Sequence, residues 1–188
     1  MYTDSANPNG NITAFPDGFQ MISGDKTLRN FSDYPVPDPP KSSWAGTDLA
    51  TQSALAQHAI GFNCLNYNAA PEGSLYRHFL PEKSFLDSQC TDGIRLELMF
   101  PSCWNGKDLD SPNHRDHVAF PDQVMTGSCP EGFPVKLPSL FYETIWNTYA
   151  FAGIDGQFVL STGDPTGKLY HILCDVPQLI HHRIRVPR

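Results

Sequence analysis

Hydrophobic and polar residues alternate along several segments of the chain with the period of two that is typical of β-strands. The clearest segment is 94–100, in which apolar and charged residues alternate before the sequence becomes fully apolar. This pattern predicts a half-buried strand whose end enters the core. Similar apolar runs bounded by turn residues predict further strands over 19–22, 59–67, 135–137, 140–146 and 157–161, with 135–137 and 140–146 forming either two strands or one bent strand.

Turn-forming residues separate these segments. The chain contains 14 Gly and 17 Pro residues, and the prolines within 32–48 argue against a helix there. A helix is predicted over 49–58, although these residues also fit a surface insertion. Since the sequence shows no repeated β-α-β pattern and no internal repeat, it predicts a mainly β fold, either an antiparallel β-sandwich or a jelly-roll-like domain with long loops.

Composition and charge narrow the class of protein. A chain of 188 residues suffices for one domain. Its net charge of −7, without a Lys/Arg cluster before residue 182, argues against a nucleic-acid partner. No apolar stretch approaches the roughly 18 residues of a membrane span, and the N-terminal residues lack the pattern of a signal peptide.

The cysteines nevertheless favour an oxidising, extracellular compartment. The first four of the five cysteines lie beside turn residues, where disulfides tie loops to a sheet. Among their three alternative pairings we favour Cys64–Cys90 with Cys103–Cys129, and four buried free thiols are the competing interpretation. Two N-glycosylation sequons near the N-terminus also favour secretion.

The segment 100–121 is the richest in side chains that perform chemistry, with Asp110, His114 and His117 close together. Imidazole and carboxylate groups transfer protons near neutral pH and bind metal ions. Three interpretations are open: a structured turn with satisfied polar groups, a glycan or substrate site with His114 or His117 as acid or base, and a metal site through these two histidines. No organic cofactor is predicted.

A second candidate segment is 163–167, a Gly-Asp-Pro-Thr-Gly turn that follows a predicted strand. Asp164 is expected to point into a cleft with His171 behind it, so that the two join Asp110, His114 and His117 in one catalytic site at an edge of the sheet. A hairpin turn without a catalytic role explains the same residues.

The three tryptophans, Trp44, Trp104 and Trp146, are candidates for stacking on sugar rings. Packing in the core competes with this interpretation. For Trp104, which follows Cys103, packing on a disulfide is the more common arrangement.

Five stretches of the sequence resemble a fungal secreted family, the domain of unknown function numbered nineteen ninety-six, which is often joined to WSC carbohydrate-binding modules. The stretches are AFPDGFQMISGD at 14–25, IGFNCLNYN at 60–68, CTDGIRLELMFPSCWNGKDLDSPNHRDHVAFP at 90–121, CPEGFPVKLPSLFYE at 129–143 and FVLSTGDPTG at 158–167. The resemblance implies secretion, four paired cysteines and an association with fungal walls or plant biomass. It implies no particular reaction.

Both ends of the sequence depart from this family. Its members begin with a signal peptide and a Ser-His-Val-His-like motif, and they continue after the segment 163–167 with a His-Gly-Asp-Phe motif, of which only His171 is present here. We therefore expect one truncated secreted β domain over 1–171. Residues 172–188 are interpreted as an atypical basic tail, an artefact of the gene model that packs poorly.

Two functional hypotheses follow from these observations. The first is a secreted enzyme that acts on cell-wall or plant polysaccharides through the His and Asp residues named above. The second is a non-catalytic carbohydrate- or wall-binding domain that uses Trp and Tyr side chains. A pair of carboxylates at glycosidase distance would favour the first hypothesis, and a flat aromatic strip would favour the second.

Overall fold

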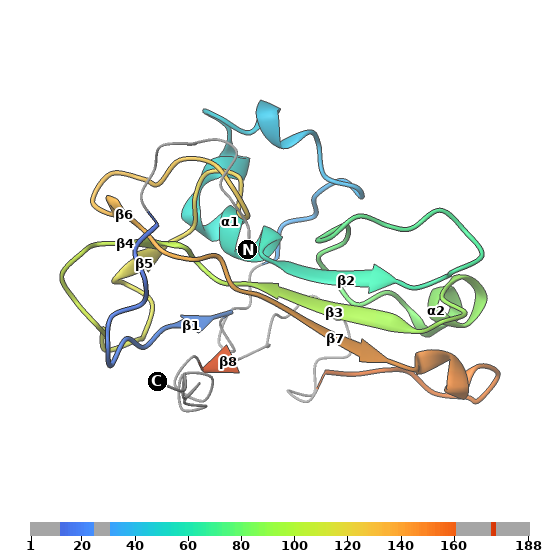
Figure 1. The fold of residues 1–188 in the computed structure, drawn as a ribbon. Helices are drawn as coiled ribbons and strands as arrows, with labels where there is room; N and C mark the ends of the chain where they lie inside the picture. The colour runs from blue at the N-terminus through green and yellow to red at the C-terminus, as the bar shows by residue number, and fades with distance from the viewer. Residues whose placement is uncertain (1–11, 25–30, 161–173, 176–188) are drawn as a thin grey trace.

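The computed structural model describes residues 12–24, 31–160 and 174–175 (Figure 1). Its largest sheet has the strand order β2-β3-β7 and is antiparallel. The strands are β2 (Ile60–Cys64), β3 (Ile94–Met99) and β7 (Phe141–Trp146). The predicted strand over 94–100 is therefore the central strand of this sheet.

The second half of β3 is buried on both faces, in keeping with its central position in the sheet. Ile94 and Leu98 are buried in the core, and Leu98 lies opposite Ile60 on one side and Tyr142 on the other. Between them, Glu97 is also fully buried, because its carboxylate accepts a hydrogen bond from Leu75 N at 2.6 Å and forms an ion pair with Arg95 at 2.6 Å. Burial raises the pKa of Glu97, although these partners oppose the rise.

Two smaller antiparallel sheets complete the β structure of the described residues. One has the order β5-β4-β6, and the other pairs β1 with β8. Their strands are β4 (Cys103–Trp104), β5 (Val118–Ala119), β6 (Val135–Lys136), β1 (Ile22–Ser23) and β8 (Cys174–Asp175). The prediction of a mainly β chain with antiparallel sheets and long loops is confirmed, whereas the predicted strand at 157–161 is wrong over 157–160, which are irregular.

Helices occupy the ends of the largest sheet (Figure 1). The predicted helix over 49–58 is confirmed in its main part as α1 (Gln52–His58), preceded by the 3-10 helix η2 (Asp48–Ala50). Of the other helices, α2 (Lys83–Gln89) and η3 (Thr148–Phe151) were not predicted. The expectation of no helix within 32–48 is wrong at the 3-10 helix η1 (Lys41–Ser43), because a single turn that starts directly after Pro40 needs no N–H group from a proline. None of the described helices has the length and apolar character required to cross a bilayer.

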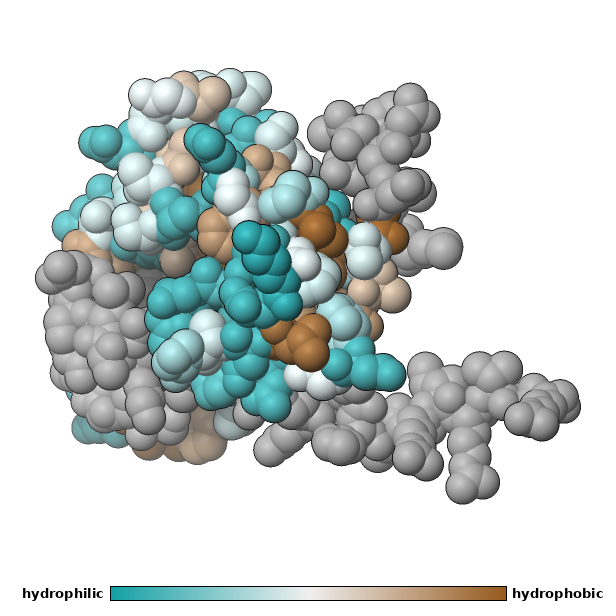
Figure 2. Space-filling view, turned by 90° about the vertical axis from the view of Figure 1, so that its left-hand side faces the viewer, coloured by the Kyte–Doolittle hydropathy of each residue, from teal (hydrophilic) through white to brown (hydrophobic). Residues whose placement is uncertain are grey.

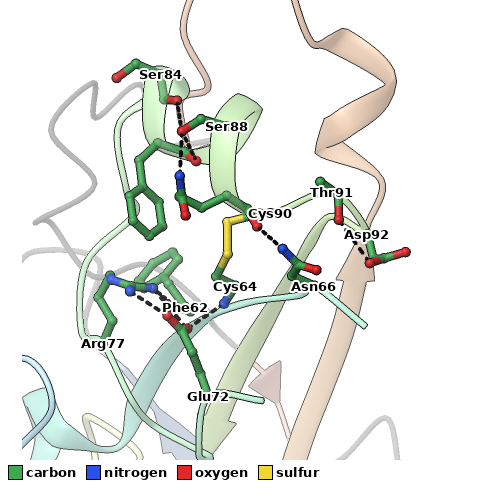
Figure 3. Close-up of a disulfide and its surroundings, with 12 residues drawn as sticks. Phe62, Cys64, Asn66, Glu72, Arg77, Ser84, Ser88, Cys90, Thr91 and Asp92 are labelled. Carbon is green, nitrogen blue, oxygen red and sulfur yellow. Dashed lines mark hydrogen bonds and ion pairs between the residues drawn. A yellow bond between two sulfur atoms is a disulfide. The ribbon is translucent and has the colours of Figure 1, made fainter. Parts of the chain in front are cut away.

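Disulfides join Cys64 to Cys90 and Cys103 to Cys129, with Cα–Cα distances of 5.1 and 5.6 Å. This is the pairing favoured from the sequence. The first bridge ties the end of β2 to the residue that follows α2 (Figure 3). The second bridge starts in β4 and anchors the loop that leads to β6.

Two hydrophobic clusters form the interior. The first contains the Cys64–Cys90 bridge together with Leu86 of α2, Ile60 and Phe62 of β2, and Ile94 and Leu98 of β3. The second surrounds Trp44 and Leu55 and lies against α1. Of the predicted tail, only β8 falls within the described residues.

Candidate metal centre

The sequence-predicted site residues Asp110 and His114 lie in the loop between β4 and β5. This loop lies at the left-hand end of the molecule in Figure 1, and Figure 2 shows that much of the described surface at this end is hydrophilic. His114 Nδ1 and Asp110 Oδ1 are 2.6 Å apart, and both side chains are more than one third exposed. Burial raises the pKa of Asp110, but its hydrogen bond with His114 and that from Ser111 N outweigh this effect and lower it. These two residues form a solvent-exposed carboxylate–imidazole pair.

His117 differs from this exposed pair because it is buried. Its side chain is buried, its Nδ1 lies 2.9 Å from Ser111 Oγ, and its ring packs edge-on against Phe19 at 5.2 Å. Burial lowers the pKa of His117. The joint role of His114 and His117 in binding a metal stays a prediction, and Asp164 and His171 lie outside the described residues.

The three tryptophans have different environments. Trp44 is fully buried and donates its Nε1 hydrogen to Pro39 O, so the prediction that it stacks on a sugar is wrong. Trp104 is half-buried and packs edge-on against Phe19. Trp146, at the end of β7, is 60% exposed and is available for stacking.

A group that the sequence reasoning missed brings together Asp38, His58 and His78. Asp38 Oδ2 lies 3.1 Å from His58 Nδ1 and 3.0 Å from His78 Nε2, and these two ring nitrogens are 3.0 Å apart. The three atoms therefore form a nearly equilateral triangle. The two histidine side chains are 1% and 3% exposed, and that of Asp38 is 11% exposed.

Each ligand atom is positioned by a different part of the fold. His58 is the last residue of α1, whose first turn is capped by Thr51 Oγ1, which accepts a hydrogen bond from Ala54 N. The ring of His78 is oriented by Ile60 O, which lies 2.7 Å from its Nδ1. Asp38 comes from the proline-rich segment, in which a proline precedes it and another follows it, so the backbone has little freedom there.

Aromatic rings enclose the His58 imidazole. The Tyr34 ring lies 4.4 Å and the Trp44 ring 4.6 Å from it, measured between centroids. Two buried polar atoms of the cluster, Asp38 Oδ1 and His58 Nε2, have no hydrogen-bond partner among the described residues. A buried carboxylate oxygen without a donor is costly unless a cation neutralises it.

No distribution of protons turns all three contacts of the triangle into hydrogen bonds. Because Ile60 O can only accept a hydrogen bond, His78 Nδ1 carries a hydrogen and donates it. With one proton inside the triangle, two lone pairs face each other along one edge. Because the lowered pKa of Asp38 keeps its carboxylate ionised, two protons inside the triangle both lie on histidines, and their N–H groups face each other at 3.0 Å. A cation bound to the three atoms removes this conflict, because each atom then directs a lone pair toward it.

The electrostatic environment favours the unprotonated forms that bind metals. Burial raises the pKa of Asp38, but hydrogen bonds and charges from His58 and His78 outweigh it and lower the pKa to about 2. Burial lowers the pKa of His58, in the same direction as the nearby His78 and Lys41, although the Asp38 carboxylate opposes this. The result is an ionised carboxylate beside a neutral imidazole at neutral pH.

Sequence reasoning missed the cluster because its members share no local motif. His78 lies 20 residues from His58 and 40 residues from Asp38. The signal in the sequence is indirect: both histidines are flanked by apolar residues, in Leu-Ala-Gln-His-Ala-Ile and Arg-His-Phe-Leu. A histidine in such a context is expected to be buried, and a buried imidazole needs a partner.

Comparison with protein families matches residues 1–172 to one family, described as Domain of unknown function (DUF1996). This match confirms the resemblance drawn from the five sequence stretches. No curated protein and no solved structure matches the chain.

Proposed function

Since the chain belongs to the DUF1996 family, whose description names no activity, we propose from its geometry that it is a metal-binding domain in which Asp38, His58 and His78 hold one divalent transition-metal ion. The single observation that carries this proposal is the triangle of donor atoms with edges of 3.0, 3.0 and 3.1 Å. Its three contacts are mutually incompatible as hydrogen bonds and are compatible as metal ligands.

The donor set and its dimensions narrow the choice of ion. Two imidazoles and one carboxylate suit Zn²⁺, Fe²⁺ and related transition metals better than Mg²⁺ or Ca²⁺, which prefer oxygen ligands. Neighbouring ligands about 2.1 Å from an octahedral ion are about 3.0 Å apart, whereas those of a tetrahedral ion are about 3.4 Å apart. The observed edges favour three ligands on one face of an octahedron, and Asp38 Oδ1 is a further donor on the same carboxylate.

The surroundings support a structural role for the ion. The ligands come from the proline-rich segment, from the end of α1 and from the segment after β2, so the ion ties these three parts together. The hydrogen bond from His78 Nδ1 to Ile60 O resembles the outer-shell contacts that orient metal-bound histidines.

The test is metal binding by the purified chain after treatment with a chelator. Titration calorimetry and elemental analysis are expected to give one Zn²⁺, Co²⁺ or Fe²⁺ ion per chain, and the visible spectrum of the Co²⁺ form reports its coordination number. His78→Ala is expected to weaken binding by more than about 100-fold, beyond the effect typical of a residue that only supports a ligand.

The matched control is His114→Ala, which removes the exposed histidine of the predicted His114/His117 site and is expected to leave the stoichiometry and affinity unchanged. Loss of binding in His114→Ala with retention in His78→Ala would refute the proposed centre and favour the site expected from the sequence. Both variants are checked by circular dichroism.

A polysaccharide-active enzyme is the second candidate, supported by the exposed Asp110–His114 pair, whose 2.6 Å contact suits acid–base chemistry at the surface. A non-catalytic carbohydrate-binding role draws support from the exposed Trp146.

Secretion, glycosylation and a polysaccharide partner remain proposals, and the two disulfides are consistent with an oxidising compartment. The wild type and Asp110→Asn are incubated with wall polysaccharides, and a reducing-sugar assay follows. Release of sugar by the wild type but not by the variant favours the enzyme, and no release by either favours the non-catalytic role.

A further inference from the structure

A cavity of about 420 Å³ lies beside α1 and is distinct from the ligand atoms of the metal centre. Its walls are mainly apolar and come from distant parts of the chain, including Ile22, Ala54, Ile60, Pro101, Val118 and Phe120. This volume is within the range of pockets that hold small molecules. One charged side chain, Arg115, also lines the cavity.

Arg115 differs from the other arginines that the structure describes. Arg77 forms an ion pair with Glu72 at 2.7 Å, and Arg95 pairs with Glu97. Half-buried Arg115 has no carboxylate partner in the described parts of the chain. Its hydrogen bonds run to backbone carbonyls, from Nε to Gly24 O at 2.9 Å and from Nη1 to Asn113 O at 3.4 Å. Among the described residues, the guanidinium therefore brings to an apolar cavity a positive charge that no carboxylate pairs with.

Two polar side chains that line the cavity, those of Gln52 and Gln57, are already used to build its wall. Gln52 donates to Phe120 O and accepts from Phe120 N, both at 2.8 Å. In the same way, Gln57 donates to Ser32 O at 2.7 Å and accepts from Ser32 N at 3.1 Å. These paired bonds hold the wall in place, and Arg115 is the charged group among the described lining residues that can recognise the polar end of a ligand.

We propose that this cavity binds a small monocarboxylate with an apolar body, its carboxylate on Arg115. A guanidinium binds a carboxylate through parallel hydrogen bonds, and the apolar walls accept a hydrocarbon chain or ring. A dicarboxylate fits less well, because its second charge would be buried without a partner. The proposal does not depend on the metal centre, since Arg115 is not one of its ligands.

The test is titration calorimetry of the full chain with octanoate, decanoate and 3-phenylpropionate, each below its micelle concentration, and with 1-octanol as the neutral counterpart of octanoate. At least one carboxylate is expected to bind at a single site, and 1-octanol is expected to bind at least about 10-fold more weakly than octanoate. Arg115→Gln is expected to weaken carboxylate binding by about 10-fold or more, whereas Arg115→Lys keeps the charge and is expected to retain part of it.

The matched control is Lys107→Gln, which removes an exposed positive charge outside the cavity and is expected to change nothing. The proposal is overturned if none of the three carboxylates binds at millimolar concentration, if 1-octanol binds as tightly as octanoate, or if folded Arg115→Gln binds as the wild type does. The titration is repeated on His78→Ala, which lacks one proposed metal ligand. Unchanged carboxylate binding in this variant is expected, and it shows that the cavity and the metal centre are independent.

Discussion

At the residue scale, the Asp38, His58 and His78 cluster changes the pKa values of Asp38 and His58. The low pKa of Asp38 arises from the two imidazoles beside it, which outweigh the effect of its burial. The pKa of His58 is lowered mainly by burial, and the Asp38 carboxylate only partly compensates. Removing His58 is therefore expected to raise the pKa of Asp38, and removing Asp38 is expected to lower the pKa of His58 further.

Acid is expected to destabilise the metal-free chain through His58. Its folded-state pKa lies below the ordinary value of 6.5, so between these two values the unfolded chain binds more protons than the folded chain. The free energy of unfolding therefore rises with pH in this window and falls on acidification, by at most about 1.4 kcal/mol per pH unit for one proton. Asp38 adds a loss at lower pH, between 3.8 and about 2.

Urea unfolding of the metal-free chain between pH 5 and 8 measures this dependence. His117 acts in the same direction, and Glu97, whose pKa is raised, acts in the opposite one. The comparison is therefore the slope of the wild type minus that of His58→Gln. A difference of zero, or greater stability of the wild type on acidification relative to the variant, would contradict the assignment.

At the scale of elements, α1 links helix stability to metal affinity. Thr51 begins the helix and His58 ends it, so fraying at the first turn loosens a metal ligand two turns away. Thr51→Ala removes the cap and is expected to cost about 1 kcal/mol of stability. We also expect weaker Zn²⁺ binding, measured by competition with a chromophoric chelator. Thr51→Ser keeps the capping oxygen and is expected to retain both the stability and the Zn²⁺ affinity. Normal metal affinity in Thr51→Ala would show that metal binding does not depend on the stability of this helix.

Elements with a strong local pattern were predictable from the sequence, and those stabilised by long-range contacts were not. The strand over 94–100 is predicted by its alternation of apolar and charged residues. The helix α2 lacks a side-chain cap and buries only Leu86, so its seven residues carry little helical signal. Residues 157–160 have a β-like composition but no strand partner in the described structure.

The candidate site shows the same division. The candidate side chains of the loop at 100–121 are close in sequence and could therefore be predicted as a group. In the structure, Asp110 and His114 of this group are in contact. The Asp38, His58 and His78 cluster requires a tertiary fold that brings together three segments, and no spacing rule predicts such a meeting. The lack of a carboxylate partner for Arg115 among the described residues could not be predicted from the sequence either, because it depends on which side chains the fold brings near.

At the scale of the whole molecule, the metal centre and the Cys64–Cys90 disulfide stabilise different parts. The metal ligands adjoin the cluster around Trp44 and Leu55, whereas the disulfide belongs to the other hydrophobic cluster. Chelation is therefore expected to increase amide hydrogen exchange in α1 and the proline-rich segment. Reduction is expected to increase exchange in α2 and at the end of β2.

Hydrogen-exchange mass spectrometry of the metal-loaded, chelated and reduced chains distinguishes these effects. Metal at 100 times its dissociation constant is expected to stabilise the native state by about 2.7 kcal/mol, and loss of the disulfide costs about 3 kcal/mol in the loop-entropy model. Equal exchange in α1 before and after chelation would contradict a structural role for the ion.

The order of the metal ligands along the chain has a consequence for biosynthesis. All three are present once residue 78 has left the ribosome, whereas the earliest disulfide must wait for Cys90 and the later one for Cys129. On the proposed function, a nascent chain therefore carries a complete set of metal ligands before it can form either covalent bridge. A shortage of metal is then expected to affect earlier folding intermediates than a shortage of oxidant does.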